Sequence, residues 1–194
     1  MTYQKFKETY SLFPLSEILV GASSKRNVRK LLETFTCSRN SDLQDFLHHK
    51  AMTFEHHLRS RTYLYLDNAT QEVAAYFTVT ISTLHTENVS AKIIKLLDGY
   101  QDDVESIPCF LIGQLGKSDQ CQSVKVGTHI LYDATDVIDQ AQQMLGGRFI
   151  LLDAINIKEV IKFYEENVFI PIEEDETQES VKMIKPYFEL DADS

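Results

Sequence analysis

Two apolar runs of strand length, separated by one long amphipathic helix, constrain the fold of this chain more than any other feature. The runs are residues 107–117 and 148–155, and the helix between them covers residues 127–147. Apolar residues recur in the helix at three- and four-residue steps, and Gly146 or Gly147 ends it. Strands joined by a crossover helix pair in parallel, so the pattern predicts a parallel strand pair within an α/β fold. The apolar side of the helix contains Ile130, Leu131, Ala134, Val137, Ile138, Ala141 and Leu145.

A β-hairpin is expected earlier in the chain. Residues 61–66 and 72–84 are rich in β-branched and aromatic side chains, and residues 67–71 between them form a turn-like segment. The whole sheet is therefore mixed, with helices on both faces. Short helices are expected at 27–35, 90–100 and 158–167, and further strands at 168–174 and 181–190.

The first quarter of the chain is less regular. Residues 41–58 have helical periodicity, with Ser41 as the expected N-cap and Gln44 at the capping-box position. Residues 1–22 give no clear pattern. No linker or repeat interrupts the sequence, so we expect a single domain over residues 1–194.

Composition limits the cellular location and the partners. The chain has 19 basic and 29 acidic residues, a formal net charge of −10, which disfavours general binding of nucleic acid. It has three cysteines, an odd count without a CxxC motif, which favours a reducing compartment and small buried thiols. No apolar run has the length of a membrane span and no signal-peptide pattern begins the chain. A cytoplasmic protein without a membrane partner is expected.

The loop before the long helix is a candidate anion site. Backbone N–H groups at a helix N-terminus lack helical acceptors, and the helix dipole adds partial positive charge there. Gly127 leaves room for a phosphate close to the backbone. The loop carries neither GxxxxGK[ST] nor GxGxxG, and an ordinary strand-to-helix turn remains the alternative from the loop alone.

Residues 107–170 resemble the core of the GNAT superfamily of acetyl-CoA-dependent N-acetyltransferases. Residues 122–131, QSVKVGTHIL, are similar to the phosphate loop of that family, and residues 153–169, DAINIKEVIKFYEENVF, to its later strand–helix run. Lys125 and Val168 stand where the family pattern has glycine. Residues 35–81 resemble the branch that includes toxins acetylating aminoacyl-tRNA.

The resemblance implies a cosubstrate, acetyl-CoA, and a role for particular residues. Tyr164 is the implied general acid that protonates the leaving thiolate. Asn156 is implied to hydrogen-bond the pantetheine arm. The strand backbone of Leu115, Gly116 and Lys117 is implied to pair with the same arm. The pyrophosphate is implied to lie on Gln122, Ser123, Val124, Lys125, Val126, Gly127 and Thr128.

Other polar residues are weaker candidates. The attacking amine needs a base, and Glu72 and His85 are the two residues considered for that role. His129, in the first turn of the long helix, is expected to pack or to be solvated. Four histidines at 48, 49, 56 and 57 lack an HExxH pattern or a nearby completing ligand, so no metal is expected.

Three functions remain open. The chain could acetylate a small-molecule or peptide amine, acetylate the amine of aminoacyl-tRNA, or bind a partner on a GNAT fold without turnover. The net charge favours the first over tRNA unless charge is segregated on the surface. The basic cluster at residues 23–30 could contact tRNA phosphates, although a solvated helix start is the simpler interpretation. The acceptor stays open, as does the oligomeric state, with a homodimer among the candidates.

Overall fold

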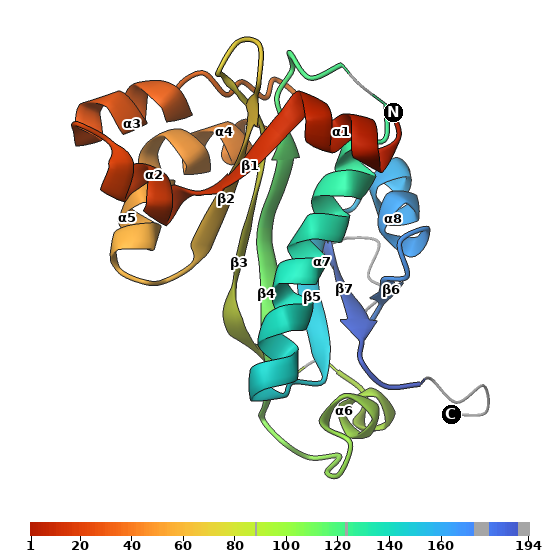
Figure 1. Ribbon diagram of the computed structural model, residues 1–194. Helices are drawn as coiled ribbons and strands as arrows, with labels where there is room; N and C mark the ends of the chain where they lie inside the picture. Colours follow the sequence, from red (N-terminus) through yellow and green to blue (C-terminus); the bar gives the residue numbers. More distant parts are fainter. Residues whose placement is uncertain (88, 123, 173–178, 190–194) are drawn as a thin grey trace. The chain divides into compact units, whose positions relative to one another are not determined.

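The computed structural model describes all residues except 88, 123, 173–178 and 190–194 (Figure 1). Within the described residues, seven strands are paired in the order β1-β2-β3-β4-β5-β7-β6. The sheet is mixed: β4 (Ser106–Lys117) and β5 (Phe149–Ile155) run parallel, and the other pairs with a described register are antiparallel. The predicted α/β class and the parallel strand pair are confirmed.

The chain divides into two compact units, and three elements pass from one to the other. The first unit is Met1–Thr80 with Gly113–Val137, and the second is Ile81–Ile112 with Ile138–Ser194. One domain over residues 1–194 stays a prediction. The shared elements are β3 (Val73–His85), β4 and α7 (Val126–Leu145).

The first unit combines the predicted hairpin with a group of helices. β2 pairs antiparallel with β3 and with β1, which contains five residues of the segment that had no clear sequence pattern. Rings and aliphatic side chains from the helices pack together with Leu64, Val73 and Tyr76 of the two hairpin strands. The elements that lie entirely in this unit are α1 (Tyr3–Thr9), β1 (Tyr10–Pro14), α2 (Leu15–Gly21), α3 (Lys25–Leu32), α4 (Ser41–Asp45), η1 (Phe46–Lys50), α5 (Ala51–His56) and β2 (Arg61–Asp67).

The predicted helix over residues 41–58 is present, but it is interrupted, and its N-cap lies one residue earlier than expected. Its N-cap is Asn40, whose side chain accepts from the backbone N–H of Asp42 at 3.0 Å, so the assignment of Ser41 was wrong. Gln44 makes no capping box, because its side chain accepts from the backbone N–H of Cys37 at 3.0 Å. The middle of the segment is a π-helix, η1, which adds one residue to a turn.

The second unit packs α6 and the strands β5 to β7 around its own core. The short helix expected at 90–100 is present as α6, which Ser90 caps through its side chain and Gly99 ends with a left-handed backbone. The expected strand at 168–174 is reduced to two residues, and residues 173 and 174 lie outside the described residues. The elements that lie entirely in this unit are α6 (Ala91–Asp98), β5, α8 (Lys158–Glu165), β6 (Ile170–Pro171) and β7 (Ser180–Pro186).

Candidate functional site

Among the described residues, backbone N–H groups at the start of α7 have no acceptor. The N–H of His129 donates to the carbonyl of Lys125 at 3.2 Å, which is the first helical hydrogen bond. Within the described part of the chain, the N–H groups of Val126, Gly127 and Thr128 find no acceptor. Since α7 is 20 residues long, its dipole adds positive potential at these donors. This end of the helix can bind an anion.

The loop itself is exposed and partly available for contacts. Gln122 donates its backbone N–H to the carbonyl of Gln120 at 3.1 Å, so only its side chain is available to a ligand. Val124 and Lys125 are exposed, whereas Ser123 lies outside the described residues. Gly127 is absent from the residues with positive φ, so it contributes space rather than an unusual backbone angle.

Lys125 has a left-handed backbone, with φ at +66°. Residues other than glycine, asparagine and aspartate rarely adopt this backbone angle. The position is one at which the GNAT pattern has glycine. The backbone of the loop therefore has the conformation that glycine favours, although the residue is lysine.

The end of β4 offers one flat face and one exposed side chain. A Cβ atom at Gly116 would lie 3.0 Å from Cδ1 of Leu43 and 3.5 Å from Cζ of Phe35, so glycine permits close packing there. Leu115 is half-buried and Lys117 is exposed, and alternation along a strand places both opposite Gly116. Contacts between this backbone and a pantetheine arm stay a prediction.

A buried carboxylate, which the sequence did not single out, fixes the first half of α7. Asp133 accepts hydrogen bonds from the hydroxyl of Tyr65, at 2.5 Å, and from that of Tyr3. Lys7 lies 3.5 Å away. In Figure 1, α1 crosses this end of α7, and the ring of Phe6 lies 5.1 Å from that of His129. The N-terminal helix thus holds the segment that follows the loop, and His129 packs as expected.

Tyr164 lies in α8, in the second unit, and is buried. Its ring contacts those of Phe163 and Phe169, with centroids 5.0 and 5.8 Å apart. Among the described residues its hydroxyl has no hydrogen-bond partner. Burial raises the pKa of Tyr164 to about 12. The hydroxyl is therefore protonated at neutral pH and is not used in a described structural hydrogen bond.

A Schellman motif positions Tyr164 at the end of α8. The N–H of Phe169 donates to the carbonyl of Tyr164, and the N–H of Val168 donates to that of Glu165, both at 3.0 Å. The contact between the Phe169 and Tyr164 rings is the apolar contact that accompanies this motif. Val168 occupies the left-handed position, with φ at +63°, where glycine is usual.

Asn156, at the end of β5, is only partly available. Its backbone N–H donates to the carbonyl of Glu179 at 3.0 Å, next to β7. Its side chain is exposed, so a side-chain contact with a ligand stays a prediction.

The two base candidates cannot both serve one site. Glu72 precedes β3 and His85 is its last residue, so a strand of 13 residues separates them. At about 3.3 Å per residue, the distance between Glu72 and His85 along the strand is larger than the span of a catalytic centre.

The other candidate constellations receive structural assignments. In the residues that the structure describes, no three metal-ligating side chains come together. His48 instead contacts the carbonyl of Phe35 through Nε2 at 2.8 Å. All three cysteines are free and buried, as expected, and burial raises the pKa of Cys109 to about 11. No helix among the described residues combines the length and the apolarity of a membrane span.

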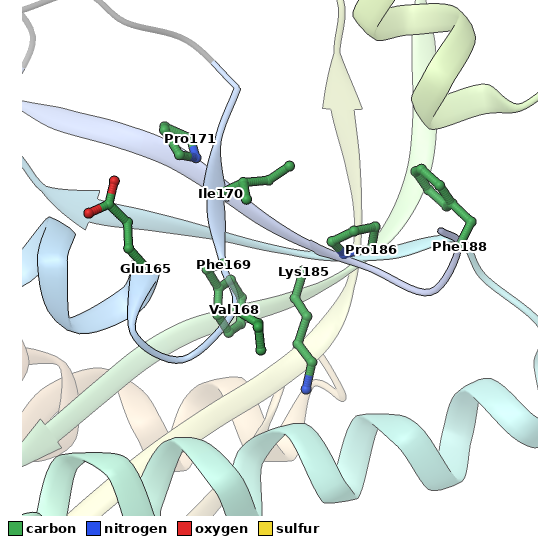
Figure 2. A pocket seen from close by; sticks show the side chains of 8 residues that line it. All are labelled: Glu165, Val168, Phe169, Ile170, Pro171, Lys185, Pro186 and Phe188. Carbon is green, nitrogen blue, oxygen red and sulfur yellow. The ribbon is translucent and has the colours of Figure 1, made fainter. Parts of the chain in front are cut away.

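A pocket of about 610 Å³ lies in the second unit beside the Schellman motif. Its lining is mostly apolar, and in Figure 2 the side chains of Val168 and Lys185 extend to the same side. The pocket could not be predicted from the sequence, because its residues come from α8, β6, the segment between them and the end of β7. They are Glu165, Val168, Phe169, Ile170, Pro171, Lys185, Pro186 and Phe188.

Comparison with solved structures identifies the fold. A tyrosine-to-phenylalanine variant of the KacT toxin has a TM-score of 0.70 at 15% identity, covering 92% of this chain and 95% of that one. A similar variant of the AtaT toxin, bound to acetyl-CoA and the C-terminus of the antitoxin AtaR, has 0.67 at 17%, covering 92% and 93%.

AtaT complexed with acetyl-methionyl-tRNAfMet has a TM-score of 0.63 at 20% identity, covering 80% of this chain and 86% of that one. No family model matches the sequence. At these identities the similarity establishes the fold, which is the GNAT fold that the sequence resemblance predicted.

Proposed function

We propose that this chain is an N-acetyltransferase that transfers the acetyl group of acetyl-CoA to a primary amine by direct attack. The observation that carries the proposal is the set of N–H groups at Val126, Gly127 and Thr128, in the first turn of a long helix, that have no acceptor among the described residues. Diphosphate is the anion that such a strand, loop and helix suit best. The acetyl-CoA bound to the AtaT variant supports the same ligand.

Some residues would bind the cosubstrate, and another would donate a hydrogen bond to the leaving sulfur. The start of α7 would hold the pyrophosphate, and the exposed side chain of Lys125 would add a positive charge beside it. When bound, acetyl-CoA supplies a thioester whose carbonyl carbon the free amine attacks, with loss of the C–S bond. Tyr164 would donate to the sulfur as it leaves. A base still has to accept the proton that the amine loses.

The raised pKa of Tyr164 defines how it donates. A thiol has an ordinary pKa of about 8.5, so a thiolate is a weaker base than a phenolate of pKa about 12. Complete transfer of the proton would be uphill by roughly 3–4 pK units. Tyr164 therefore acts mainly by hydrogen-bonding the departing sulfur in the transition state.

Ligand binding gives the first test. Acetyl-CoA should raise the melting temperature of the native chain, by mass action. Gly127→Glu should abolish the rise, because a carboxylate there blocks and repels a phosphate. Gly21→Glu is the matched control, since Gly21 has open space around it and lies at the end of α2. Absence of a shift at millimolar acetyl-CoA in the unaltered chain would refute the proposal.

Substitution of Tyr164 tests the chemical step. Tyr164→Phe should lower kcat by at least about 10²-fold while acetyl-CoA affinity stays within a few-fold. Tyr100→Phe is the control, because Tyr100 is 84% exposed. The AtaT and KacT structures carry the same type of substitution at one tyrosine. Equal turnover of both variants would show that the sulfur leaves without help from Tyr164.

Aminoacyl-tRNA is a second candidate for the acceptor, and the distribution of charge favours it. The first unit has twelve basic and eleven acidic residues, a net charge of +1. The second has seven basic and eighteen acidic residues, −11, and the two add to the −10 of the whole chain. The acidic excess therefore belongs to the second unit, and the objection to tRNA from net charge does not apply to the first. The AtaT complex with acetyl-methionyl-tRNAfMet supports this acceptor.

An acceptor screen separates the two candidates. Radiolabelled acetyl-CoA would be incubated with aminoacyl-tRNA, with polyamines and with free amino acids at matched concentrations. Label that enters only tRNA and is released by deacylation supports the second candidate. Label that enters only small amines excludes it.

A further inference from the structure

Helix α3 presents four basic side chains without a partner in the described residues. The helix, Lys25–Leu32, begins at Ser24, whose side chain accepts from the N–H of Asn27 at 3.3 Å. Val28 and Leu32 are buried in the core of the first unit. The described ion pairs do not include any of the basic residues of α3, and all four are exposed. They are Lys25, Arg26, Arg29 and Lys30.

The spacing of these charges forms two short rows. Lys25 and Arg29 are four residues apart, as are Arg26 and Lys30, so each pair lies on one side of the helix, about 5–6 Å apart. Asn27 is the remaining exposed residue of the helix. The exposed face thus offers charge and hydrogen-bond donors, without an apolar anchor.

Two further exposed basic residues, Arg39 and Lys117, lie near a contact at the end of β4. After α3 the chain returns to the end of β4, where the N–H and hydroxyl of Ser38 donate to the carboxylate of Asp119 at 2.8 and 3.1 Å. Arg39 is exposed beside this contact, and Lys117 is exposed two residues before Asp119. Lys117 is one of the residues predicted to contact the pantetheine arm.

We propose that the exposed face of α3 binds the phosphate backbone of an RNA acceptor. The proposal rests on the proposed function, with aminoacyl-tRNA as substrate. Rows of closely spaced cations match the regular charge of a nucleic acid strand. An acidic protein would fit less well, because protein interfaces carry apolar or aromatic groups at their centre, and α3 exposes none. Contacts to phosphate position the RNA without reading its sequence.

Binding of RNA can be measured without acetyl transfer. The probe is a fluorescein-labelled, unacylated RNA hairpin with a single-stranded 3′ end, followed by anisotropy at increasing KCl. The test variant of the full chain replaces the four basic residues of α3 by glutamine. Its affinity at low salt should fall about 10²-fold. The slope of log affinity against log salt should decrease by about 2–4, as expected for the loss of up to four phosphate contacts.

A control with the same net charge separates a surface from a general charge effect. It replaces four exposed lysines on α6 and α8 of the second unit by glutamine, and its RNA affinity should stay within about three-fold of the unaltered chain. Equal affinity of the α3 variant and the unaltered chain, or equal weakening by both variants, would overturn the proposal. The control lysines are Lys92, Lys95, Lys158 and Lys162.

Two further measurements distinguish the failures. The α3 variant should keep the melting-temperature rise with acetyl-CoA, so loss of RNA binding with that rise intact assigns the defect to α3. An absent rise in the unaltered chain, with α3-dependent RNA binding retained, would refute the acetyltransferase and leave the surface. A labelled polyglutamate peptide that binds α3 while the RNA hairpin does not would identify an acidic protein partner and refute the RNA proposal.

Discussion

Val168 should destabilise the protein, because it holds a left-handed backbone at an exposed position. Its φ is +63°, and its side chain is 68% exposed, so little packing compensates for the conformation. A β-branched residue at positive φ is a genuine outlier. The Schellman hydrogen bonds of the α8 terminus keep it there. Val168→Gly should therefore raise the stability of the folded state.

The magnitude follows from three contributions. Release of the left-handed strain is worth about 1–3 kcal/mol, with β-branching favouring the middle of that range. Glycine loses about 0.5–1 kcal/mol through the greater freedom of the unfolded chain. Removal of a side chain that is about one-third buried loses roughly 0.5 kcal/mol. The net gain is about 0.5–1 kcal/mol, or a rise of roughly 1–4 °C in Tm for a chain of this length.

Urea unfolding and calorimetry of Val168→Gly measure the gain. Val20→Gly is the control, because Val20 is 88% exposed and lies in helix α2, where φ is negative. The control should lose roughly 0.5 kcal/mol from lower helix propensity. A loss of stability in Val168→Gly equal to that of the control would refute the reasoning that the left-handed backbone is strained.

Two other predictions concern stability. Gly147→Ala should lower the free energy of unfolding in urea by about 2–4 kcal/mol, because the added Cβ would lie 2.5 Å from Cε2 of Phe110 on a backbone of φ +128°. Gly146→Ala is the control: its φ is +75° but the space around it is open, so the loss should be only about 1–2 kcal/mol. The second prediction uses the pKa of Tyr164, which rises from 10.0 to about 12 on folding. The stability that the neutral phenol contributes is therefore complete below pH 10 and is lost as the pH rises through 12. Relative to Tyr164→Phe, the unaltered chain should lose about 1 kcal/mol of unfolding free energy between pH 9 and pH 11, and equal losses would contradict the buried phenol.

Elements with local signals could be predicted from the sequence. The hairpin of β2 and β3 follows from two runs rich in β-branched and aromatic residues on either side of a turn-like segment. Helix α6 follows from Ser90 at its start and Gly99 at its end. The parallel pairing of β4 and β5 follows from the length of the helix between them. In each case the residues that determine the element lie within it or beside it.

Features that depend on distant partners could not be predicted. Strand β1 is paired with β2, about fifty residues later, so residues 10–14 contain little information about their own conformation. The π-helix η1 interrupts a segment whose periodicity is helical throughout. Asp133 gives no local sign that Tyr3 and Tyr65 will bury it. The pocket beside α8 likewise arises only when β6 and β7 come together.

The two departures from the GNAT glycine pattern motivate the alternative of a binding protein without turnover. Both Lys125 and Val168 keep the left-handed backbone that glycine would adopt, at φ +66° and +63°. The substitutions therefore change the side chains and the stability, while the backbone keeps the conformation expected of glycine. The two substitutions therefore give no structural reason to expect that the chain has lost acetyl-CoA binding.

Lys125→Gly separates the contribution of the backbone from that of the side chain. Relief of strain should raise Tm slightly without ligand, by the same reasoning as at Val168. Loss of the ammonium should weaken acetyl-CoA binding about 3- to 30-fold, if a charge-assisted contact to phosphate is removed. Val168→Gly, in the other unit, should share the rise in Tm and keep the affinity, which calorimetric titration would measure. Unchanged affinity in Lys125→Gly would show that the lysine side chain does not contact the phosphate, and that the backbone N–H groups of α7 are sufficient for it.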